Sequence, residues 1–438
     1  LSDILYPEDE KMAKKEMNFE GLQKALEDKV DTPLELEKLE AAVTDETKND
    51  VKPAIRLSDY RKQLRRYRQK RWVRFGTVVL GVLLLLFGVT QVMKYWSYDS
   101  YSVLKELSGD DMTTASCSKI GNKLLKFSLD RATLTDSKDK TLWSSSYTMN
   151  APAVTSCQDT IAIYDTQGTT VKVYQDQGLI GTISTDMPIV KAKVAKQGVV
   201  AAILESGDNT RIQYYDKAGK SIASFKSTMG EPGYPMDLAL SEDGLVMAVS
   251  YLQMKQSVPK TEVVFYNWGN AGQNKTDHIV NRETIKNCVA PEVQYLDPST
   301  CLLFLDDGFA VYKGKQIPKR TTRVFEKEEI VSVFYNSSHA GYVIHNNDVG
   351  KAYTMKVYDL GGKEIFSQDF DFNYTQITMD DNQVLMYNNR RMCTYSLSGV
   401  KKFEGNISEG ILNTVIPLSP NRYILVTDNG NYAIKLTK

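Results

Sequence analysis

The sequence predicts an all-β fold, an eight-bladed β-propeller, preceded by an N-terminal transmembrane helix and a short helical or disordered cytoplasmic tail. Three observations support this architecture. A unit of roughly 40 residues recurs from about residue 118 to the end of the chain. A long apolar segment without charge lies near residue 80, and basic and acidic residues are strongly segregated around it.

The repeat consists of eight turn clusters, each followed by a β-rich apolar run. Such short runs without alternation suit strands that are covered on both faces. A second strand often ends in an aromatic residue and a tight reversal, as in RIQYYDKAG and MKVYDLGG. A unit of roughly 40 residues with four strands is one propeller blade. The turn clusters lie at residues 118–122, 158–160, 195–198, 241–244, 297–300, 336–341, 380–382 and 419–422.

The two ends of the repeat region predict how the ring closes. The chain stops at NYAIKLTK, which is the third strand of the eighth unit. Residues 101–107 (YSVLKEL) form a strand that has no blade of its own. Pairing these two strands would complete the last blade and remove both exposed sheet edges. A seven-bladed ring is the alternative, because residues 112–149 form the least regular unit.

Residues 75–93 (FGTVVLGVLLLLFGVTQVM) contain no charge. As a helix this segment is about 28 Å long, and a bilayer core is about 30 Å thick. A buried core helix is the alternative, but such helices seldom run this far without a polar stripe. Aromatic and basic side chains flank the segment, as is typical of a membrane interface. The expected interface residues are Arg71, Trp72, Arg74, Tyr95 and Trp96.

Charge sets the expected orientation. Residues 61–74 include eight basic and no acidic residues, whereas only Lys94 closely follows the apolar segment. The positive-inside rule therefore places the N-terminus in the cytoplasm and residues 98–438 outside the plasma membrane. Residues 57–74 are expected to form a basic juxtamembrane helix, and residues 1–56 an acidic tail that is helical or disordered. Residues 95–438 carry 36 basic and 38 acidic residues, so no nucleic-acid partner is expected.

Two hairpins carry a resemblance to known proteins. Residues 215–220 (YDKAGK) and 358–363 (YDLGGK) resemble hairpins of quinoprotein-like and WD40-like propellers. The order of basic segment, single span and propeller resembles an uncharacterised family of membrane proteins from Gram-positive, clostridia-like bacteria. This resemblance runs from about Arg61 to the end of the chain, and it implies a fold without implying an activity.

No set of residues predicts catalysis, a cofactor or a metal. Quinoprotein dehydrogenases commonly use adjacent cysteines, and no two of the five cysteines adjoin here. With only three histidines, a zinc triad or a Ser-His-Asp relay is not expected. Asp369, Asp371 and Asn373 alternate like calcium ligands, but Tyr374 stands where the loop needs glycine. We expect a solvated strand there, and cysteines that are small buried residues without disulfides.

The leading hypothesis is an interaction module that binds a protein or an envelope polymer, with its oligomeric state left open. Residues 254–287 form a long insertion between blades four and five, and four side chains in it make a candidate interaction loop: Lys255, Lys260, Trp268 and Lys275. The alternative is a long strand pair with a flexible tip. Two other functions remain open: a glycan hydrolase or lyase with an acidic site in the central channel, or a ligand sensor that signals through the tail.

Overall fold

The computed structural model of the chain describes residues 57–107, 116–136, 140–228, 230–346 and 350–438. The expected acidic tail, residues 1–56, lies outside the described residues. The chain divides into two compact units, Leu1–Val89 and Thr90–Lys438. Helix α3 and the propeller are therefore treated separately below.

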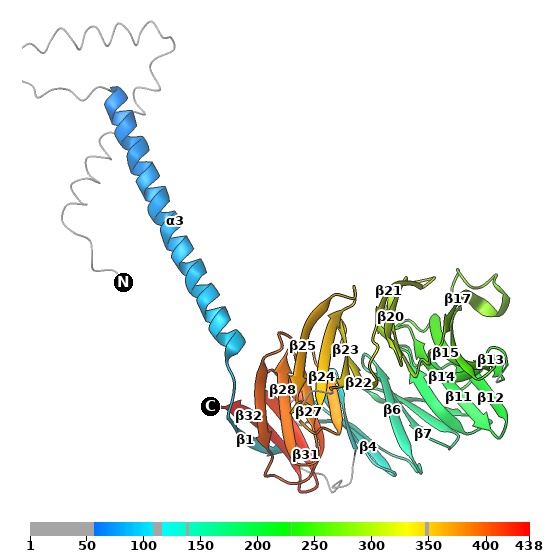
Figure 1. Cartoon of the computed structure of the whole chain (residues 1–438). Coiled ribbons are helices and arrows are strands. Elements are labelled where there is room, and N and C mark those ends of the chain that lie inside the picture. The colour runs from blue at the N-terminus through cyan, green and yellow to red at the C-terminus, as the bar shows by residue number, and fades with distance from the viewer. Residues whose placement is uncertain (1–56, 108–115, 137–139, 229, 347–349) are drawn as a thin grey trace, which may run out of the picture. The chain divides into compact units, whose positions relative to one another are not determined.

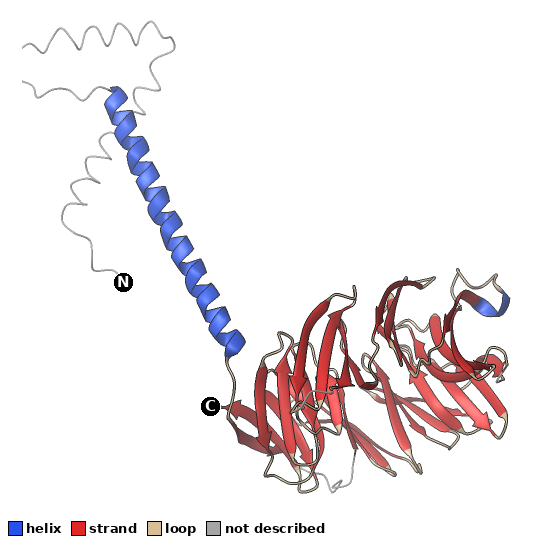
Figure 2. Ribbon diagram, viewed as in Figure 1, coloured by secondary structure: helices blue, strands red, loops and turns tan. Residues whose placement is uncertain are grey.

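Helix α3 spans Leu57–Tyr95 without interruption (Figure 2). It contains no proline, and leucine, arginine and lysine, which favour helices, are frequent in it. Its central apolar side chains are exposed, with 62% of Phe75 and 62% of Phe87 accessible. Within the part of the chain that the structure describes, no helix is long and apolar enough to cross a membrane.

The remaining described elements are strands and one short 3₁₀ helix. Blades one to four consist of β2 (Ser116–Ile120), β3 (Lys123–Phe127), β4 (Arg131–Thr135) and β5 (Thr141–Ser146); β6 (Pro152–Cys157), β7 (Thr160–Asp165), β8 (Thr170–Gln175) and β9 (Gly178–Ser184); β10 (Ile189–Val194), β11 (Val200–Ser206), β12 (Asn209–Tyr215) and β13 (Ser221–Ser227); and β14 (Tyr234–Leu240), β15 (Val246–Lys255), β16 (Val258–Asn267), η1 (Thr276–His278) and β17 (Ile279–Lys286). Blades five to eight consist of β18 (Glu292–Asp297), β19 (Thr300–Leu305), β20 (Gly308–Lys313) and β21 (Lys319–Phe325); β22 (Ile330–Tyr335), β23 (His339–His345), β24 (Tyr353–Asp359) and β25 (Glu364–Phe370); β26 (Gln376–Met379), β27 (Gln383–Tyr387), β28 (Arg391–Ser396) and β29 (Lys401–Asn406); and β30 (Leu412–Ser419), β31 (Arg422–Thr427), β32 (Asn431–Thr437) and β1 (Ser100–Leu107).

Eight four-stranded antiparallel sheets build the propeller, which confirms the leading prediction of eight blades. In seven of them the strands follow one another along the chain. The eighth takes β1 as its outer strand, and β1 pairs with β32 from Ser100–Thr437 to Leu107–Asn431 (Figure 1). The predicted closure by the first and last strands is confirmed, and it leaves no blade incomplete at the seam.

The core lies between neighbouring blades. All residues of β7, β19 and β27 are buried, because these second strands are covered on both faces by adjacent sheets. Aromatic rings join one blade to the next. Trp143 of blade one stacks on Tyr174 of blade two at 4.6 Å, and Tyr214 of blade three stacks on Trp268 of blade four at 4.4 Å between ring centroids.

The antiparallel strand order gives the propeller two distinct faces. Connections between first and second strands, and between third and fourth strands, lie on one face. We call it the proximal face, because β1 begins there at Ser100, opposite Thr437. The other connections lie on the distal face, where β1 ends at Leu107.

Candidate functional site

A cavity of about 480 Å³ lies at the proximal end of the central channel. The last residues of the innermost strands β6, β10, β14, β18 and β22 form its wall, which is largely polar. Its lining comprises Thr155, Ser156, Cys157, Gln158, Lys193, Val194, Ala239, Leu240, Glu242, Gln294, Tyr295, Leu296, Asp297, Pro298 and Tyr335. The Lys193 ammonium donates to Oε1 of Gln294 at 3.0 Å and so connects blades three and five.

A charged layer lies further along the same strands, away from the proximal face. Asp237 is 0% exposed and its Oδ2 accepts the backbone N–H of Val293 at 2.9 Å. Its Oδ1 lies 2.9 Å from Nζ of Lys191, an ion pair that lacks hydrogen-bond geometry. These residues connect blades three, four and five. A buried carboxylate needs such partners, since an unpaired charge in the interior is costly.

Glu292 is a titratable group that this layer affects. Burial raises its pKa, and the negative charge of Asp237 raises it further, while Lys193 and a hydrogen bond from Tyr335 act in the opposite direction. Neither Glu292 nor Asp237 lines the cavity. The Cys157 thiol does line it, but burial raises the pKa of that thiol, which keeps it protonated and weakly nucleophilic. The cavity is thus suited to binding polar groups.

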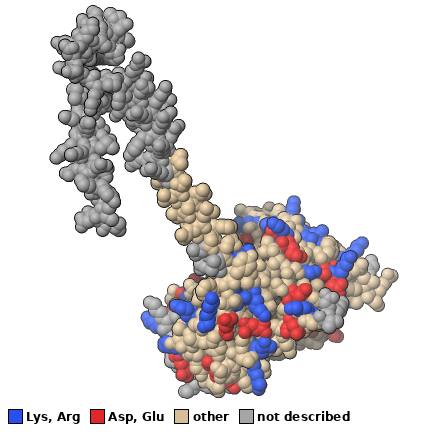
Figure 3. All heavy atoms as spheres, turned by 60° about the vertical axis from the view of Figure 1, so that its left-hand side comes forward, with Lys and Arg blue, Asp and Glu red and all other residues tan. Residues whose placement is uncertain are grey.

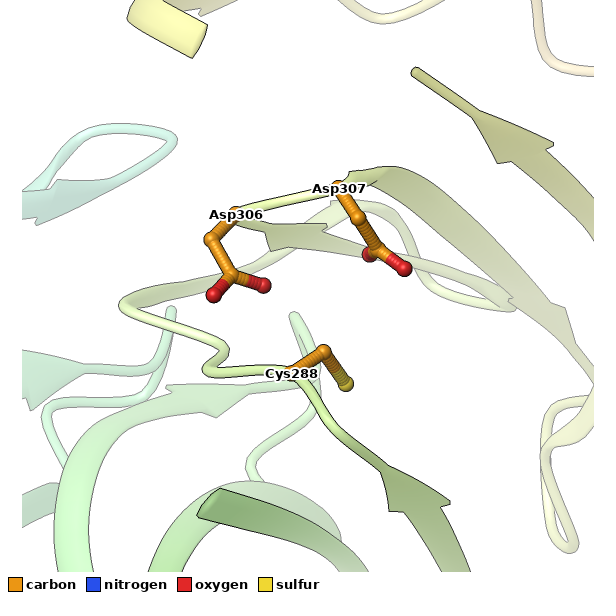
Figure 4. Close-up of side chains that lie close together, drawn as sticks. All are labelled: Cys288, Asp306 and Asp307. Atoms are coloured by element: carbon orange, nitrogen blue, oxygen red, sulfur yellow. The ribbon is translucent and has the colours of Figure 1, made fainter. Parts of the chain in front are cut away.

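A second cluster contains Cys288, Asp306 and Asp307, whose ligand atoms lie within 4.8 Å of one another (Figure 4). The two carboxylates come from the turn between β19 and β20, and the thiol from the loop after β17. Burial raises the pKa of the Cys288 thiol to about 11, with the two carboxylates acting in the same direction. A metal-bound cysteine must be a thiolate.

The carboxylates of this cluster already have partners. Oδ1 of Asp306 accepts the backbone N–H of Val289 at 3.0 Å, and Asp307 accepts a hydrogen bond from the Arg323 guanidinium. The Arg323 side chain is only 9% exposed, so its positive charge needs the Asp307 carboxylate as a partner. The three ligand atoms are close enough for a metal site, but both carboxylates already have protein partners that a metal ion would have to compete with.

Blade four carries the longest hairpin. Strands β15 and β16 pair over ten residue pairs, from Val246–Asn267 to Lys255–Val258. Gln256 and Ser257 form the two-residue turn with φ of 51° and 64°. On its inner side β14 pairs only as far as Leu252, so the tip projects from the distal face with an unpaired inner edge. Met254 and Val258 at this tip are 52% and 45% exposed.

The structure places the four residues of the candidate interaction loop on different elements. The segment is the outer half of blade four, and not an insertion between blades. The side chain of Lys255 lies outside the described part, and the Lys260 ammonium donates to Gln253 Oε1 at 3.1 Å within the hairpin. Trp268 packs on Tyr214 between blades, and Lys275 is exposed on the proximal face. The four therefore do not form one loop.

Three residues of the expected membrane interface have described side chains. Trp72, Tyr95 and Trp96 are all exposed, whereas the side chains of Arg71 and Arg74 lie outside the described part. The Lys402 ammonium donates to the backbone oxygens of Lys94 and Trp96 at 2.7 and 2.9 Å. These bonds hold the residues that precede β1 against the proximal face of blade seven.

Charge is distributed unequally between the two faces. Counting strand ends and connections among the described residues, and leaving out the seam beside β1 and β32, the proximal face has eleven exposed basic and six exposed acidic residues, and the distal face has five and nine. Figure 3 shows that basic and acidic side chains both occur on the visible side of the propeller. The basic excess is concentrated in the connections between third and fourth strands, at the outer rim. This lysine rim comprises Lys140, Lys217, Lys220, Lys275, Lys313, Lys315, Lys319, Lys363 and Lys401.

Strand order, closure and the channel define an eight-bladed β-propeller. Residues 94–436 match the family of unknown function DUF5711, and the chain belongs to this family. No curated protein matches the chain significantly.

Three solved propellers illustrate the structural likeness. BamB from Moraxella catarrhalis is 9% identical, with a TM-score of 0.48 over 77% of this chain and 99% of that chain. AztD from Citrobacter koseri is 11% identical, with a TM-score of 0.46 over 66% and 85%. The Neurospora crassa Pan2 WD40 domain is 11% identical, with a TM-score of 0.40 over 66% and 90%. The fold is assigned from strand order, and these likenesses carry no functional conclusion.

Proposed function

We propose that this protein is a plasma-membrane-anchored propeller that lies outside the cytoplasm and binds a protein or an envelope polymer. The anchor is residues 75–93, a stretch without charge inside one continuous helix, α3. Its apolar side chains between Phe75 and Phe87 are exposed, and exposed apolar surface of this extent needs a lipid or protein environment. In Figure 3 the described side chains of the helix are largely uncharged. The basic residues before the segment support a cytoplasmic N-terminus.

The contact element in this proposal is the β15–β16 hairpin. The observation that carries it is the projection of this hairpin beyond β14, with Met254 and Val258 exposed at its tip. Two large apolar side chains on a tip without a partner in the propeller are typical of a recognition element. The tip lies on the distal face, so a partner reaches it without approaching the residues that precede β1.

Site-specific photo-crosslinking in native membranes tests this contact. A photoreactive amino acid at Gln256 should form an adduct, and the same amino acid at Gln177, exposed on the proximal face, should not. The Met254→Ser/Val258→Ser variant should lose the adduct, whereas Leu179→Ser, a similarly exposed position on β9, should keep it. An adduct that survives the double substitution, or equal adducts at both positions, would reject the hairpin as the contact.

A glycan hydrolase or lyase is the second candidate function. The favouring observation is the raised pKa of Glu292, because a general acid must hold its proton near neutral pH. The position of Glu292 beneath the cavity wall counts against this function, and Asp237 is already ion-paired. Purified protein screened against glycans decides between the two. Turnover that Glu292→Gln abolishes would establish an enzyme.

Signalling through the N-terminal tail is a third function, and it shares the anchor and the propeller with the first. It differs in requiring residues 1–56. Deleting these residues leaves a binding module intact but should abolish every phenotype of a sensor. A phenotype of the full chain that survives this deletion would therefore exclude signalling.

A further inference from the structure

The lysine rim surrounds the proximal face, and few of its lysines have an acidic partner among the described residues. Exposed lysines occur in the third-to-fourth connections of six blades, and in the described part of all these connections the exposed acids are Asp176, Asp277 and Glu364. Among the described residues, Lys401 is the one member of the rim that forms an ion pair, with Glu404 at 2.8 Å. The turn carboxylates Asp216 and Asp359 instead accept backbone N–H groups of their own hairpins.

The distribution is specific to this face. The propeller as a whole is close to neutral, so solubility does not require nine exposed lysines on one rim. Like charges on one rim repel one another, and the repulsion falls when an anionic surface or counterions lie against them. The distal face has an acidic excess, so it would not attract an anionic surface. The rim lysines are spread around the whole proximal face, and a planar anionic surface is the partner that can contact them together.

The residues just before β1 indicate that this partner is a membrane surface. Trp96 and Tyr98 precede β1 at the proximal face, where Lys402 donates to the Trp96 carbonyl and the Tyr98 N–H donates to the Lys402 carbonyl at 2.7 Å. Trp96 is exposed, and Nζ of Lys438 lies 3.9 Å from its ring centroid. Indole and lysine side chains together are typical of the headgroup region of a bilayer. The chain thus enters the propeller on the side of the lysine rim, beside Trp96.

We propose that the lysine rim docks the proximal face on the phosphates of anionic lipid headgroups. This inference rests on the proposed anchor and adds an orientation to it: the channel cavity faces the bilayer and the β15–β16 hairpin faces away. Each lysine near an anionic surface contributes about 1 kcal/mol, and salt screens the attraction. A few rim contacts are therefore enough to hold an already tethered propeller against the surface.

Lysine acylation of the full chain in lipid nanodiscs tests the docking. Discs of phosphatidylcholine alone are compared with discs that also contain phosphatidylglycerol, and acylation is followed by mass spectrometry. In anionic discs Lys217, Lys275 and Lys363 should react at least about threefold more slowly, and about 1 M salt should abolish this difference. Lys286 and Lys327 on the distal face should react equally in both discs.

Charge-reversal variants provide the matched comparison. Lys217→Glu/Lys220→Glu/Lys363→Glu should remove the protection of Lys275, and Lys226→Glu/Lys286→Glu/Lys327→Glu should leave it unchanged. A chain that does not enter either disc would overturn the anchor itself. A chain that inserts but whose rim lysines react equally in both discs would overturn the docking and leave the anchor intact.

Discussion

Tyr101 in the first strand of the propeller bonds through its hydroxyl to Ser408, which lies in the connection between blades seven and eight, at 2.9 Å. Its ring also meets that of Phe403 edge-on, with centroids 6.4 Å apart. Strand β1 therefore completes the eighth sheet and also holds the seventh blade. The stability of the ring should depend on this strand more than on any other outer strand.

Removing the Tyr101 side chain tests that dependence. Tyr101→Ala should lower the free energy of unfolding by about 2 kcal/mol, because it removes a half-buried aromatic ring and its hydrogen bonds. Leu104→Ser at the exposed bulge of the same strand should change it by less than about 0.5 kcal/mol. Urea unfolding followed by tryptophan fluorescence measures both. Equal effects would mean that the seam contributes little.

Gly308 should not tolerate a side chain. Its φ is +128°, and a β-carbon would lie 2.1 Å from the carbonyl oxygen of Val324. Gly308→Ala should cost about 2 kcal/mol or more. Gly121 has φ of +57° with open space around it, so Gly121→Ala should cost only about 1 kcal/mol. Thermal unfolding compares the two variants, and a smaller loss at Gly308 would contradict the close approach of β20 and β21.

The charged layer in the channel makes a third prediction. Lys191→Met leaves the carboxylate of Asp237 buried without its ion pair and should lower the free energy of unfolding by about 3 kcal/mol. Lys193→Met on the same strand removes a bond to the neutral Gln294 and a positive charge near the half-buried Glu292, and it should cost about 1 kcal/mol. Adding Asp237→Asn to Lys191→Met should restore part of the loss. No restoration would show that Lys191 acts through packing.

The raised pKa of Glu292 predicts a pH effect. Between its ordinary value of 4.5 and the raised value, the folded state binds more protons than the unfolded state. Stability therefore falls as pH rises through that window. Glu292→Gln removes this dependence, so its stability relative to wild type should rise from about pH 4 to about pH 7. Glu328→Gln is an exposed control, and its free energy of unfolding should follow that of wild type at every pH. A Glu292→Gln variant that also follows wild type would contradict the burial of the Glu292 carboxyl.

Most of the propeller could be predicted from sequence because turns and apolar runs are local signals. The hairpins of residues 215–220 and 358–363 contain Asp and Gly at positions that reverse the chain, and the structure has turns there. The pairing of β1 with β32 followed from counting strands, since an eighth blade with three strands needs a fourth.

Blade four was harder to predict because its hairpin turn lacks the usual residues. Gln256 and Ser257 adopt positive φ, although hairpin turns of this kind usually contain glycine or asparagine. Because the usual turn residues are missing, the sequence of this segment resembles an inserted loop. Trp268 was expected at a contact surface, but its partner Tyr214 lies on the previous blade. Such a contact between blades leaves no local pattern.

The channel residues could have been found only in part. Lys191 is one of two lysines in the first strand IVKAKV, and Asp237 is the one charge in the first strand YPMDLAL. Charges within such apolar strands are a usable signal. Which of them faces a partner depends on the register and twist of separate sheets. The order of residues within one strand does not determine that arrangement.

The orientation of the chain across the membrane is the central claim, and a two-tag accessibility measurement tests it most directly. The account predicts that the chain stays in the membrane fraction at alkaline pH. It also predicts that antibody reaches a tag after Lys438 on intact cells, and reaches a tag before residue 1 only after permeabilisation. A chain released by alkali, or a C-terminal tag hidden until permeabilisation, would contradict it.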